Sequence, residues 1–211
     1  MRSRLKFAAP GAPTIATLAA AAAGAYFFSH ALAAFLALPF ALALWFYRDP
    51  DRTPGGTSDS WVSPADGHVV EIIETTDDFA GRSVKIGIFM NGFDVHVNRF
   101  PRDGTVRDII YVPGKKWFAF APKASEENER MYVRILTPEG RATLVQIAGI
   151  MARRIVCYAK KGDSLARGER YGMIKLGSKV DVYMPEGISP AVCVGDRVKA
   201  GESVIGVKKI R

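Results

Sequence analysis

The chain reverses direction within the stretch Met131-Tyr132-Val133-Arg134-Ile135-Leu136-Thr137-Pro138-Glu139-Gly140-Arg141-Ala142-Thr143-Leu144-Val145-Gln146-Ile147. Two apolar runs, Met131–Thr137 and Arg141–Ile147, stand on either side of Pro138-Glu139-Gly140. Apolar runs joined by a short turn that contains glycine are typical of a β-hairpin. We therefore predict two antiparallel strands in this stretch.

Further apolar runs, each bounded by turn residues, lie on both sides of this hairpin. They are Val69–Ile73, Val84–Met90, Thr105–Val112, Arg153–Tyr158, Met173–Leu176, Val180–Met184 and Val204–Lys208. Closely spaced short strands without helical patterns between them favour a sandwich or a barrel. The one predicted helix of this region is short, around Ser125–Arg130. The sequence thus predicts a mainly β domain.

Two segments refine this expectation. The segment from Ser63 to Val70 resembles the opening strand of lipoyl- or biotinyl-type domains, and Val194 to Glu202 resembles their later turn. Glycine at such a turn permits the tight reversal of the chain. The resemblance implies a lipoyl-like flattened β-barrel or sandwich, similar to a barrel-sandwich hybrid.

The N-terminal region is of a different kind. From Phe7 to Tyr47 the chain has 41 consecutive residues without Asp, Glu, Lys or Arg. One membrane helix needs about 20 apolar residues, and Ser29-His30 divides the run in two. We predict a hydrophobic helical membrane segment in residues 1–47, either a helical hairpin or a pair lying partly in the membrane, followed by a separate domain at 48–211. The alternative is a cleaved signal peptide with small residues near Ala23, but the apolar run continues far beyond such a site.

The charge distribution indicates the partner. The net charge is +8, and residues 150–211 carry 13 basic and 6 acidic side chains. Nucleic-acid-binding surfaces interleave aromatic residues with basic ones, whereas this last third has three Tyr and no Phe or Trp. We therefore expect a membrane surface as partner and no nucleic acid. Basic residues flank both ends of the apolar run, which predicts a cell-membrane location with the larger domain on the cytoplasmic side.

The counts of metal-binding residue types are low. Cys157 and Cys193 are the only cysteines, which excludes a disulfide-dense scaffold and a four-Cys metal site. His30, His68 and His96 are the only histidines. We therefore expect no metal.

The candidate reactive residues each have a plain structural explanation when taken singly. Asp66 is a turn residue in Ala-Asp-Gly, His68 begins a strand, and His96 and Arg99 lie in a half-buried strand. The Gly177-Ser178 step fits a β-bulge.

Taken together, the motifs resemble a known family. In chain order they are Ser63-Pro64-Ala65-Asp66-Gly67, Phe93-Asp94-Val95-His96-Val97-Asn98-Arg99-Phe100-Pro101, Asn128-Glu129-Arg130, Gln146-Ile147-Ala148-Gly149 with Ala152-Arg153-Arg154-Ile155-Val156, and Gly172-Met173-Ile174-Lys175-Leu176-Gly177-Ser178-Lys179-Val180-Asp181. Over roughly residues 48–211 the chain is similar to the short bacterial and archaeal phosphatidylserine decarboxylases.

This resemblance implies a proenzyme that makes its own pyruvoyl cofactor. Ser178 Oγ would attack the Gly177 carbonyl, and cleavage would give a β chain, 1–177, and an α chain, 178–211, that stay together as a heterodimer. The pyruvoyl group, derived from Ser178, would form a Schiff base with the amine of phosphatidylserine. Decarboxylation would then yield phosphatidylethanolamine for phospholipid biosynthesis.

The resemblance also implies roles for individual residues. His96 would act as the base, with Asp66 orienting it, and Asn98 and Arg99 would bind substrate, Arg99 at the phosphate. Longer relatives carry a second histidine at the position of Arg99, and Arg99 cannot serve as a base because it stays protonated. His68 therefore remains an alternative base for processing.

Two other functions stay open from the sequence. One is a non-catalytic, membrane-anchored lipoyl-like adaptor, in which Lys175 would be a modified lysine. The other is a pyruvoyl decarboxylase that acts on another serine-headed lipid or on an amino acid.

Overall fold

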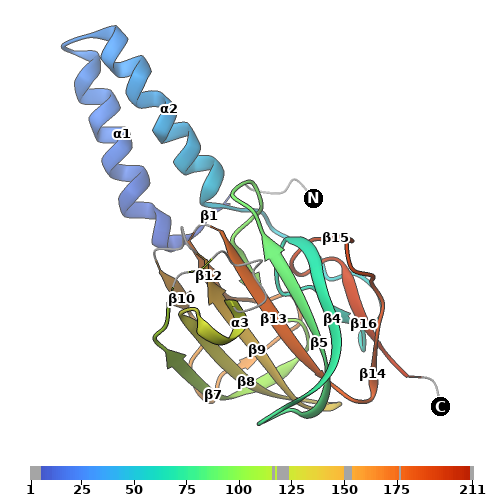
Figure 1. Cartoon of the computed structure of the whole chain (residues 1–211). Helices are drawn as coiled ribbons and strands as arrows, with labels where there is room; N and C mark the ends of the chain where they lie inside the picture. Colours follow the sequence, from blue (N-terminus) through green and yellow to red (C-terminus); the bar gives the residue numbers. More distant parts are fainter. Residues whose placement is uncertain (1–5, 116, 118–123, 150–153, 176, 210–211) are drawn as a thin grey trace. The chain divides into compact units, whose positions relative to one another are not determined.

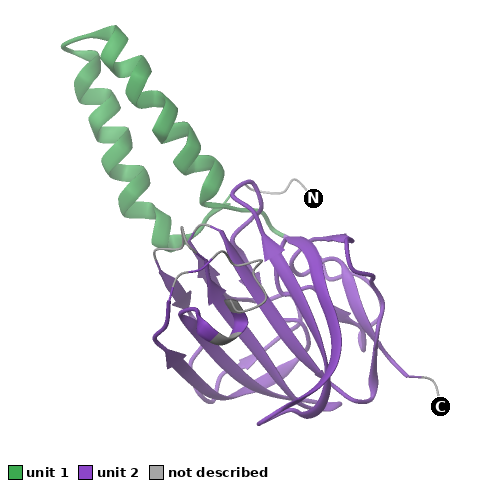
Figure 2. Ribbon diagram, in the orientation of Figure 1, with its two compact units in different colours: residues 1–51 green, residues 52–211 purple. Residues whose placement is uncertain are grey.

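The computed structural model describes residues 6–115, 117, 124–149, 154–175 and 177–209. The chain divides into two compact units, residues 1–51 and 52–211 (Figure 2).

The first unit is a helical hairpin. Helix α1 spans Ala12–Tyr26 and α2 spans His30–Phe46, so the predicted division at Ser29-His30 is confirmed. Ser29 is the N-cap of α2, because its Oγ accepts a hydrogen bond from Leu32 N (3.4 Å). The second helix therefore begins directly after Ser29.

Short elements lie at the base of this hairpin. A 3-10 turn, η1, covers Ala9–Gly11, and strand β1 (Lys6–Phe7) pairs antiparallel with β2 (Arg48–Asp49). Within the described residues, neither helix is both long and apolar enough to cross a membrane. The membrane association of this segment stays a prediction.

The second unit is built on a strongly curled antiparallel sheet (Figure 1). Its neighbouring strands all run antiparallel. In spatial order they are β11 (Ser164–Leu165), β7 (Gly104–Val112), β8 (Arg130–Thr137), β9 (Gly140–Ala148), β13 (Ser178–Pro185), β5 (Gly81–Met90), β4 (Gly67–Asp77) and β15 (Arg197–Val198). The predicted mainly β character is therefore confirmed.

Two smaller antiparallel sheets complete the unit. The first has the order β10 (Ile155–Cys157), β12 (Arg170–Ile174) and β6 (Val97–Arg99). The second has the order β14 (Ile188–Pro190), β16 (Val204–Lys208) and β3 (Trp61–Val62). Every predicted strand overlaps one of these strands, although the predicted ends Arg153 and Leu176 lie outside the described residues.

The hairpin predicted around Pro138-Glu139-Gly140 forms. Thr137 of β8 pairs with Gly140 of β9, and Gly140 has a φ of 135°, which glycine adopts readily. The predicted helix is shorter than expected, since α3 spans only Ala124–Glu127. It ends there because Asn128 turns into the sheet, where its Nδ2 donates to the Ala148 carbonyl (2.7 Å).

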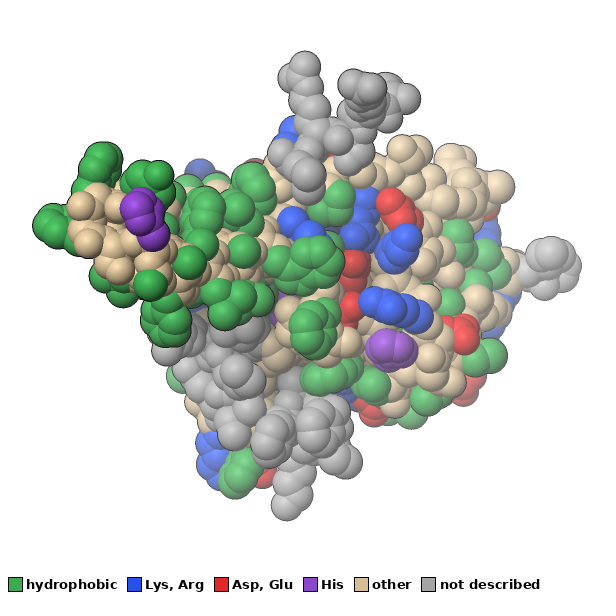
Figure 3. All heavy atoms as spheres, turned by 90° about the horizontal axis from the view of Figure 1, so that it is seen from above, with side chains coloured by type: hydrophobic (Ala, Val, Ile, Leu, Met, Phe, Trp, Pro, Cys, Tyr) green, Lys and Arg blue, Asp and Glu red, His purple; other side chains and the backbone are tan. Residues whose placement is uncertain are grey.

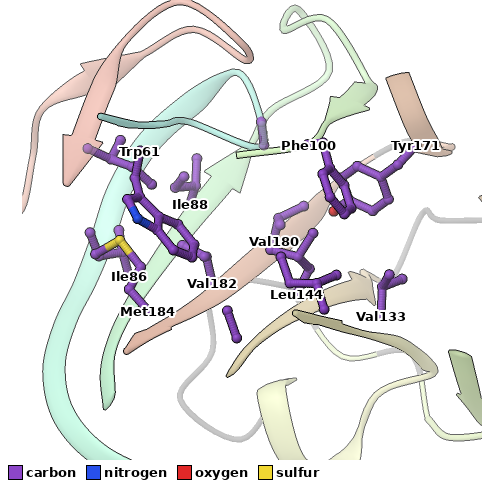
Figure 4. Close-up of a cluster of buried hydrophobic side chains, with 14 of the residues drawn as sticks. Trp61, Ile86, Ile88, Phe100, Val133, Leu144, Tyr171, Val180, Val182 and Met184 are labelled. Carbon is purple, nitrogen blue, oxygen red and sulfur yellow. The ribbon is translucent and has the colours of Figure 1, made fainter. Parts of the chain in front are cut away.

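The core lies on the concave face of the curled sheet. Side chains of β5, β9 and β13 meet Trp61 and the ring pair Phe100–Tyr171, whose centroids are 6.0 Å apart (Figure 4). These side chains are almost wholly removed from solvent, and burial of apolar area is the main force that holds the curled sheet against Trp61 and the ring pair. The core thus lies on the face of β13 to which Ser178 belongs.

Candidate active site

Ser178 is the first residue of β13, a central strand of the large sheet. It pairs with Met90 of β5 on one side and with Ala148 of β9 on the other. The side chain is fully buried, and Oγ has no hydrogen-bond partner among the described residues. A buried hydroxyl without a partner is costly, and such atoms are expected where a group is kept available for reaction.

Gly177 precedes it with a φ of 51°. A Cβ built on Gly177 would meet nothing within 4 Å, so space does not require glycine here. The left-handed backbone does favour it. Gly177 thus gives the peptide before Ser178 a conformation that other residues rarely adopt.

His96 lies in the segment between β5 and β6 and is completely buried. Its Nδ1 donates to the Asp94 carbonyl, 2.9 Å away. Because a carbonyl can only accept, this bond fixes the proton of a neutral imidazole on Nδ1 and makes Nε2 the basic nitrogen. The His96 carbonyl in turn accepts from Ile174 N (3.3 Å), which brings His96 to the end of β12, four residues before Ser178.

Asn98 and Gln146 form a buried amide pair. Gln146 lies opposite Val180 of β13 and so on the face of the large sheet that carries Ser178. Gln146 Nε2 donates to Asn98 Oδ1 (2.8 Å), and Asn98 Nδ2 lies 3.6 Å from the sulfur of Met90, the residue that pairs with Ser178. Gln146 Oε1, like Ser178 Oγ, has no partner within the described part of the chain. Gly172 leaves room for the pair, because a Cβ there would lie 2.6 Å from Gln146 Nε2.

Asp66 has a different partner from the one expected. Its carboxylate is bound by Arg52 at both oxygens (Nη1–Oδ1 2.5 Å, Nη2–Oδ2 2.8 Å) and by Ala200 N (2.8 Å). His96 Nδ1 is bonded to the Asp94 carbonyl. Arg99 N donates to Pro64 O (2.9 Å), so the segment before Asp66 runs beside β6. The role of Asp66 in processing stays a prediction.

Arg99 bonds to a loop, and His68 lies on the face of the large sheet opposite Ser178. The guanidinium of Arg99 is buried and donates from Nη1 to the Gly168 carbonyl (2.9 Å), so it holds a loop; headgroup binding by Arg99 stays a prediction. His68 pairs with Phe89, whereas Ser178 pairs with the next residue, Met90. Neighbouring residues of a strand point to opposite faces, so His68 and Ser178 are on opposite faces of the sheet.

The structure thus places Gly177 and Ser178 at the start of β13, His96 beside the end of β12, and Asn98 beside Met90. Gln146, to which no role was assigned from the sequence, is bonded to Asn98. Its signal was a lone amide in the otherwise apolar run from Leu144 to Ala148. A buried hydroxyl directly after a glycine of positive φ, with a histidine in the segment bonded to the end of β12, can support nucleophilic attack on the backbone. Within the described residues, no group of three or more His, Cys, Asp or Glu side chains is placed to hold a metal.

Comparison with known families agrees with this geometry. Residues 40–206 match the family described as Phosphatidylserine decarboxylase. The chain therefore belongs to the phosphatidylserine decarboxylase family, as the motifs predicted.

Individual relatives share much of the chain. It is 49% identical over 181 residues to the phosphatidylserine decarboxylase proenzyme of Oleidesulfovibrio alaskensis, with 83% of each chain covered. It is 46% identical over 205 residues to the protein of the same name from Nitratidesulfovibrio vulgaris, with 94% of this chain and 90% of the relative covered. The protein of that name from Solidesulfovibrio magneticus is 51% identical over 165 residues, which is 77% of each chain.

Proposed function

We propose that this protein is a proenzyme that decarboxylates phosphatidylserine to phosphatidylethanolamine through a pyruvoyl group made from Ser178. The observation that carries the proposal is the buried Ser178 hydroxyl, placed directly after the positive-φ Gly177 in a chain of this family. The name proenzyme, given to the similar relatives, supports a precursor that is cut into two chains.

Self-cleavage would proceed in three steps: an acyl shift, an elimination and a hydrolysis. Ser178 Oγ attacks the Gly177 carbonyl carbon, an ester C–O bond forms and the peptide C–N bond breaks. The base carries the hydroxyl proton to the Ser178 nitrogen, which becomes a free amine. Removal of the Ser178 α-proton then expels the Gly177 carboxylate and leaves a dehydroalanine. One water hydrolyses the dehydroalanine, with release of ammonia. The products are chains 1–177 and 178–211, which we propose remain together as a heterodimer.

His96 is our proposed base. Its Nδ1–H bond to the Asp94 carbonyl keeps Nε2 as the proton acceptor, and a serine hydroxyl needs such a base to become a useful nucleophile. His68 is the weaker alternative, because it lies on the other face of the sheet.

The surroundings of Ser178 suit decarboxylation as well. The pyruvoyl group supplies an electron sink for the loss of a carboxylate. Met90, Ala148 and Val180 make the neighbourhood apolar and buried, which favours departure of neutral CO2 over retention of the carboxylate. We propose that Asn98, held by Gln146, binds the polar part of the substrate.

We further propose that the helical hairpin holds the protein at the cytoplasmic side of the cell membrane. Hydrophobic side chains are exposed along the face of the hairpin seen in Figure 3, and Phe27, Phe28 and Phe35 are 85%, 90% and 72% exposed. Exposed apolar area of this extent marks an interaction surface. Flotation with phosphatidylserine vesicles should carry the protein upward, and Phe27→Ser/Phe28→Ser should weaken this; flotation unchanged by the double variant would contradict the assignment.

The finer fold assignment is also a proposal. The pairing of β15 with β4 joins the two segments that resemble lipoyl-type domains, with Val198 opposite Gly67 and Arg197 opposite His68. This supports a lipoyl-like, barrel-sandwich arrangement around them.

One measurement tests the central proposal. Intact-mass analysis of the purified protein should show two chains with a break between Gly177 and Ser178, and the 178–211 chain should react with a carbonyl reagent. Phosphatidylserine in mixed micelles should then release CO2, and free serine should release much less. A single unmodified chain of 23.0 kDa would overturn the pyruvoyl mechanism, and equal release from both substrates would overturn the lipid assignment.

A further inference from the structure

The face of β13 opposite Ser178 carries buried charge. Because side chains alternate along a strand, Lys179 and Asp181 point away from the core face that holds Ser178 and Val180. Their side chains are only 6% and 1% exposed. Lys and Asp are almost never buried to this extent unless they are paired.

Both residues are paired within one cluster. Lys179 Nζ lies 2.9 Å from Glu71 Oε2, 3.1 Å from Asp181 Oδ1 and 3.0 Å from Ser125 Oγ. Ser125 Oγ donates to Asp181 Oδ2 (3.0 Å), and Lys85 Nζ lies 2.9 Å from Glu71 Oε1. These five residues, the lysine–carboxylate cluster, contain two lysines and two carboxylates, so their formal charges cancel.

The sheet leaves space for this cluster. Gly87 of β5 lies opposite Asp181, and a Cβ there would come within 2.6 Å of Lys179 Cε and 3.0 Å of Asp181 Oδ1. Burial acts to lower the pKa of Lys179, but Asp181 and Glu71 outweigh it and the pKa is raised. Lys179 therefore keeps its charge at neutral pH.

The position of the cluster is informative if the chain is cut as proposed above, and the inference rests on that proposed cleavage. Lys179 and Asp181 would then belong to the chain 178–211, and Glu71, Lys85 and Ser125 to the chain 1–177. We infer that the lysine–carboxylate cluster is a clamp that holds the new end of the 178–211 chain in register, so that residue 178 stays in the site. Lys179 and Asp181 are thus positioning residues.

The physical reason is the behaviour of chain ends. A chain end frays unless contacts tie it down, and cleavage would turn the middle of a continuous chain into such an end one residue before Lys179. Fraying or slippage of β13 would separate buried charges from their partners, which is strongly unfavourable. The cluster therefore opposes the one motion that cleavage makes possible.

A second ion pair across the same two chains serves as the matched control. Arg82 of β5 pairs with Glu186 just after β13, but their side chains are 77% and 57% exposed. Exposed ion pairs contribute little to the free energy of folding. Arg82→Met should therefore leave the behaviour of the cleaved protein unchanged.

The experiment compares Lys179→Met with wild type in cleaved form and, on a Ser178→Ala background, in uncleaved form. We expect the melting temperature of the cleaved protein to fall by about 10 °C and that of the uncleaved protein to fall clearly less. Native mass spectrometry should show loss of the 178–211 chain. Decarboxylation should lose about tenfold in kcat with little change in KM, and Lys179→Arg should recover part of each effect.

Equal loss of melting temperature in both forms, with full retention of the 178–211 chain, would overturn the clamp. If Lys179→Met does not fold, Glu71→Gln at the rim of the cluster replaces it with the same expectations. A wild-type chain that never cleaves would refute the proposed function itself, an outcome distinct from a cleaved chain that Lys179→Met leaves intact.

Discussion

The two faces of strand β13 differ in almost every physical property. On the core face, Ser178 is followed by Val180 and Val182, and the Ser178 hydroxyl has no partner in the part of the chain that the structure describes. On the other face, Lys179 and Asp181 are tied into the lysine–carboxylate cluster by contacts of 2.9 to 3.1 Å. Alternation along a single strand places these residues a few ångströms apart but on opposite sides of the sheet.

The reactive hydroxyl of β13 is thus on one face of the strand, and the charged contacts that stabilise the strand are on the other. A reactive hydroxyl has to remain available, which leaves a buried polar atom without its usual bond. The charged residues on the other face have to be paired, and Asp181 Oδ1 is paired through its 3.1 Å ion contact with Lys179 Nζ. One strand can meet both demands because its two faces contact different surroundings.

The largest expected effect concerns the reactive face. Ser178→Ala removes the nucleophile, so we expect no cleavage at all and one chain of full mass. Intact-mass analysis after prolonged incubation measures this. Ser189→Ala, a partly buried serine of the same 178–211 segment, should cleave like the wild type, and cleavage of Ser178→Ala at the wild-type rate would refute the assignment.

The next expected effect is a difference in cleavage rate between variants of His96 and His68. His96→Gln should slow cleavage by about 10²–10⁴-fold, the usual contribution of a general base. His68→Gln should cleave normally, because its side chain shares a face with Phe89 and not with Ser178. A time course of the fraction cleaved measures both variants. The reverse ranking would move the base to the other side of the sheet.

A smaller effect tests whether Asp66 serves structure or chemistry. Asp66→Asn breaks its buried ion pair with Arg52, whose side chain is 6% exposed, and should cost about 3 kcal/mol of unfolding free energy. Urea denaturation on the Ser178→Ala background measures this apart from cleavage. Glu186→Gln, from an exposed pair, should change the free energy by less than about 1 kcal/mol. Normal stability of Asp66→Asn together with slow cleavage would show that Asp66 acts in the chemistry instead.

The smallest expected effect is a difference in the labelling rates of the two cysteines, one in each of the proposed chains. Burial raises the pKa of the Cys157 thiol, with a smaller opposing contribution from its bond to the Ala159 carbonyl, and Cys193 is exposed. Since the thiolate is the nucleophile, iodoacetamide near pH 8 should label Cys193 several-fold faster than Cys157. Peptide mapping of the labelled protein measures the ratio. Faster labelling of Cys157 would mean that the sheet around β10 opens readily.

Much of the fold could be predicted from the sequence because it depends on local patterns. The Pro138-Glu139-Gly140 turn, the apolar runs on both sides of it and the break at Ser29-His30 all use short-range chemistry, and each forms in the structure. The helix around Ser125–Arg130 was predicted too long. Its end is decided by Asn128, which bonds to a carbonyl twenty residues away in the chain.

The candidate site divides in the same way. The order of the motifs pointed to Gly177, Ser178 and His96, because residue types at fixed spacings are visible in a sequence. Gln146 received no role, and Asp66 was expected beside His96 although it binds Arg52. Those contacts join residues from distant strands, and no local pattern specifies which strands become neighbours.

The sequence by itself therefore determined the strand pattern, the apolar hairpin and the family, since these follow from periodicity, turn chemistry and ordered motifs. Only the tertiary structure decided which face of β13 each residue occupies, which partner each buried charge has and that His68 lies on the face opposite Ser178. The reason is physical: in a sheet these choices are set by register between strands far apart in the chain, and a shift of one residue would exchange the two faces.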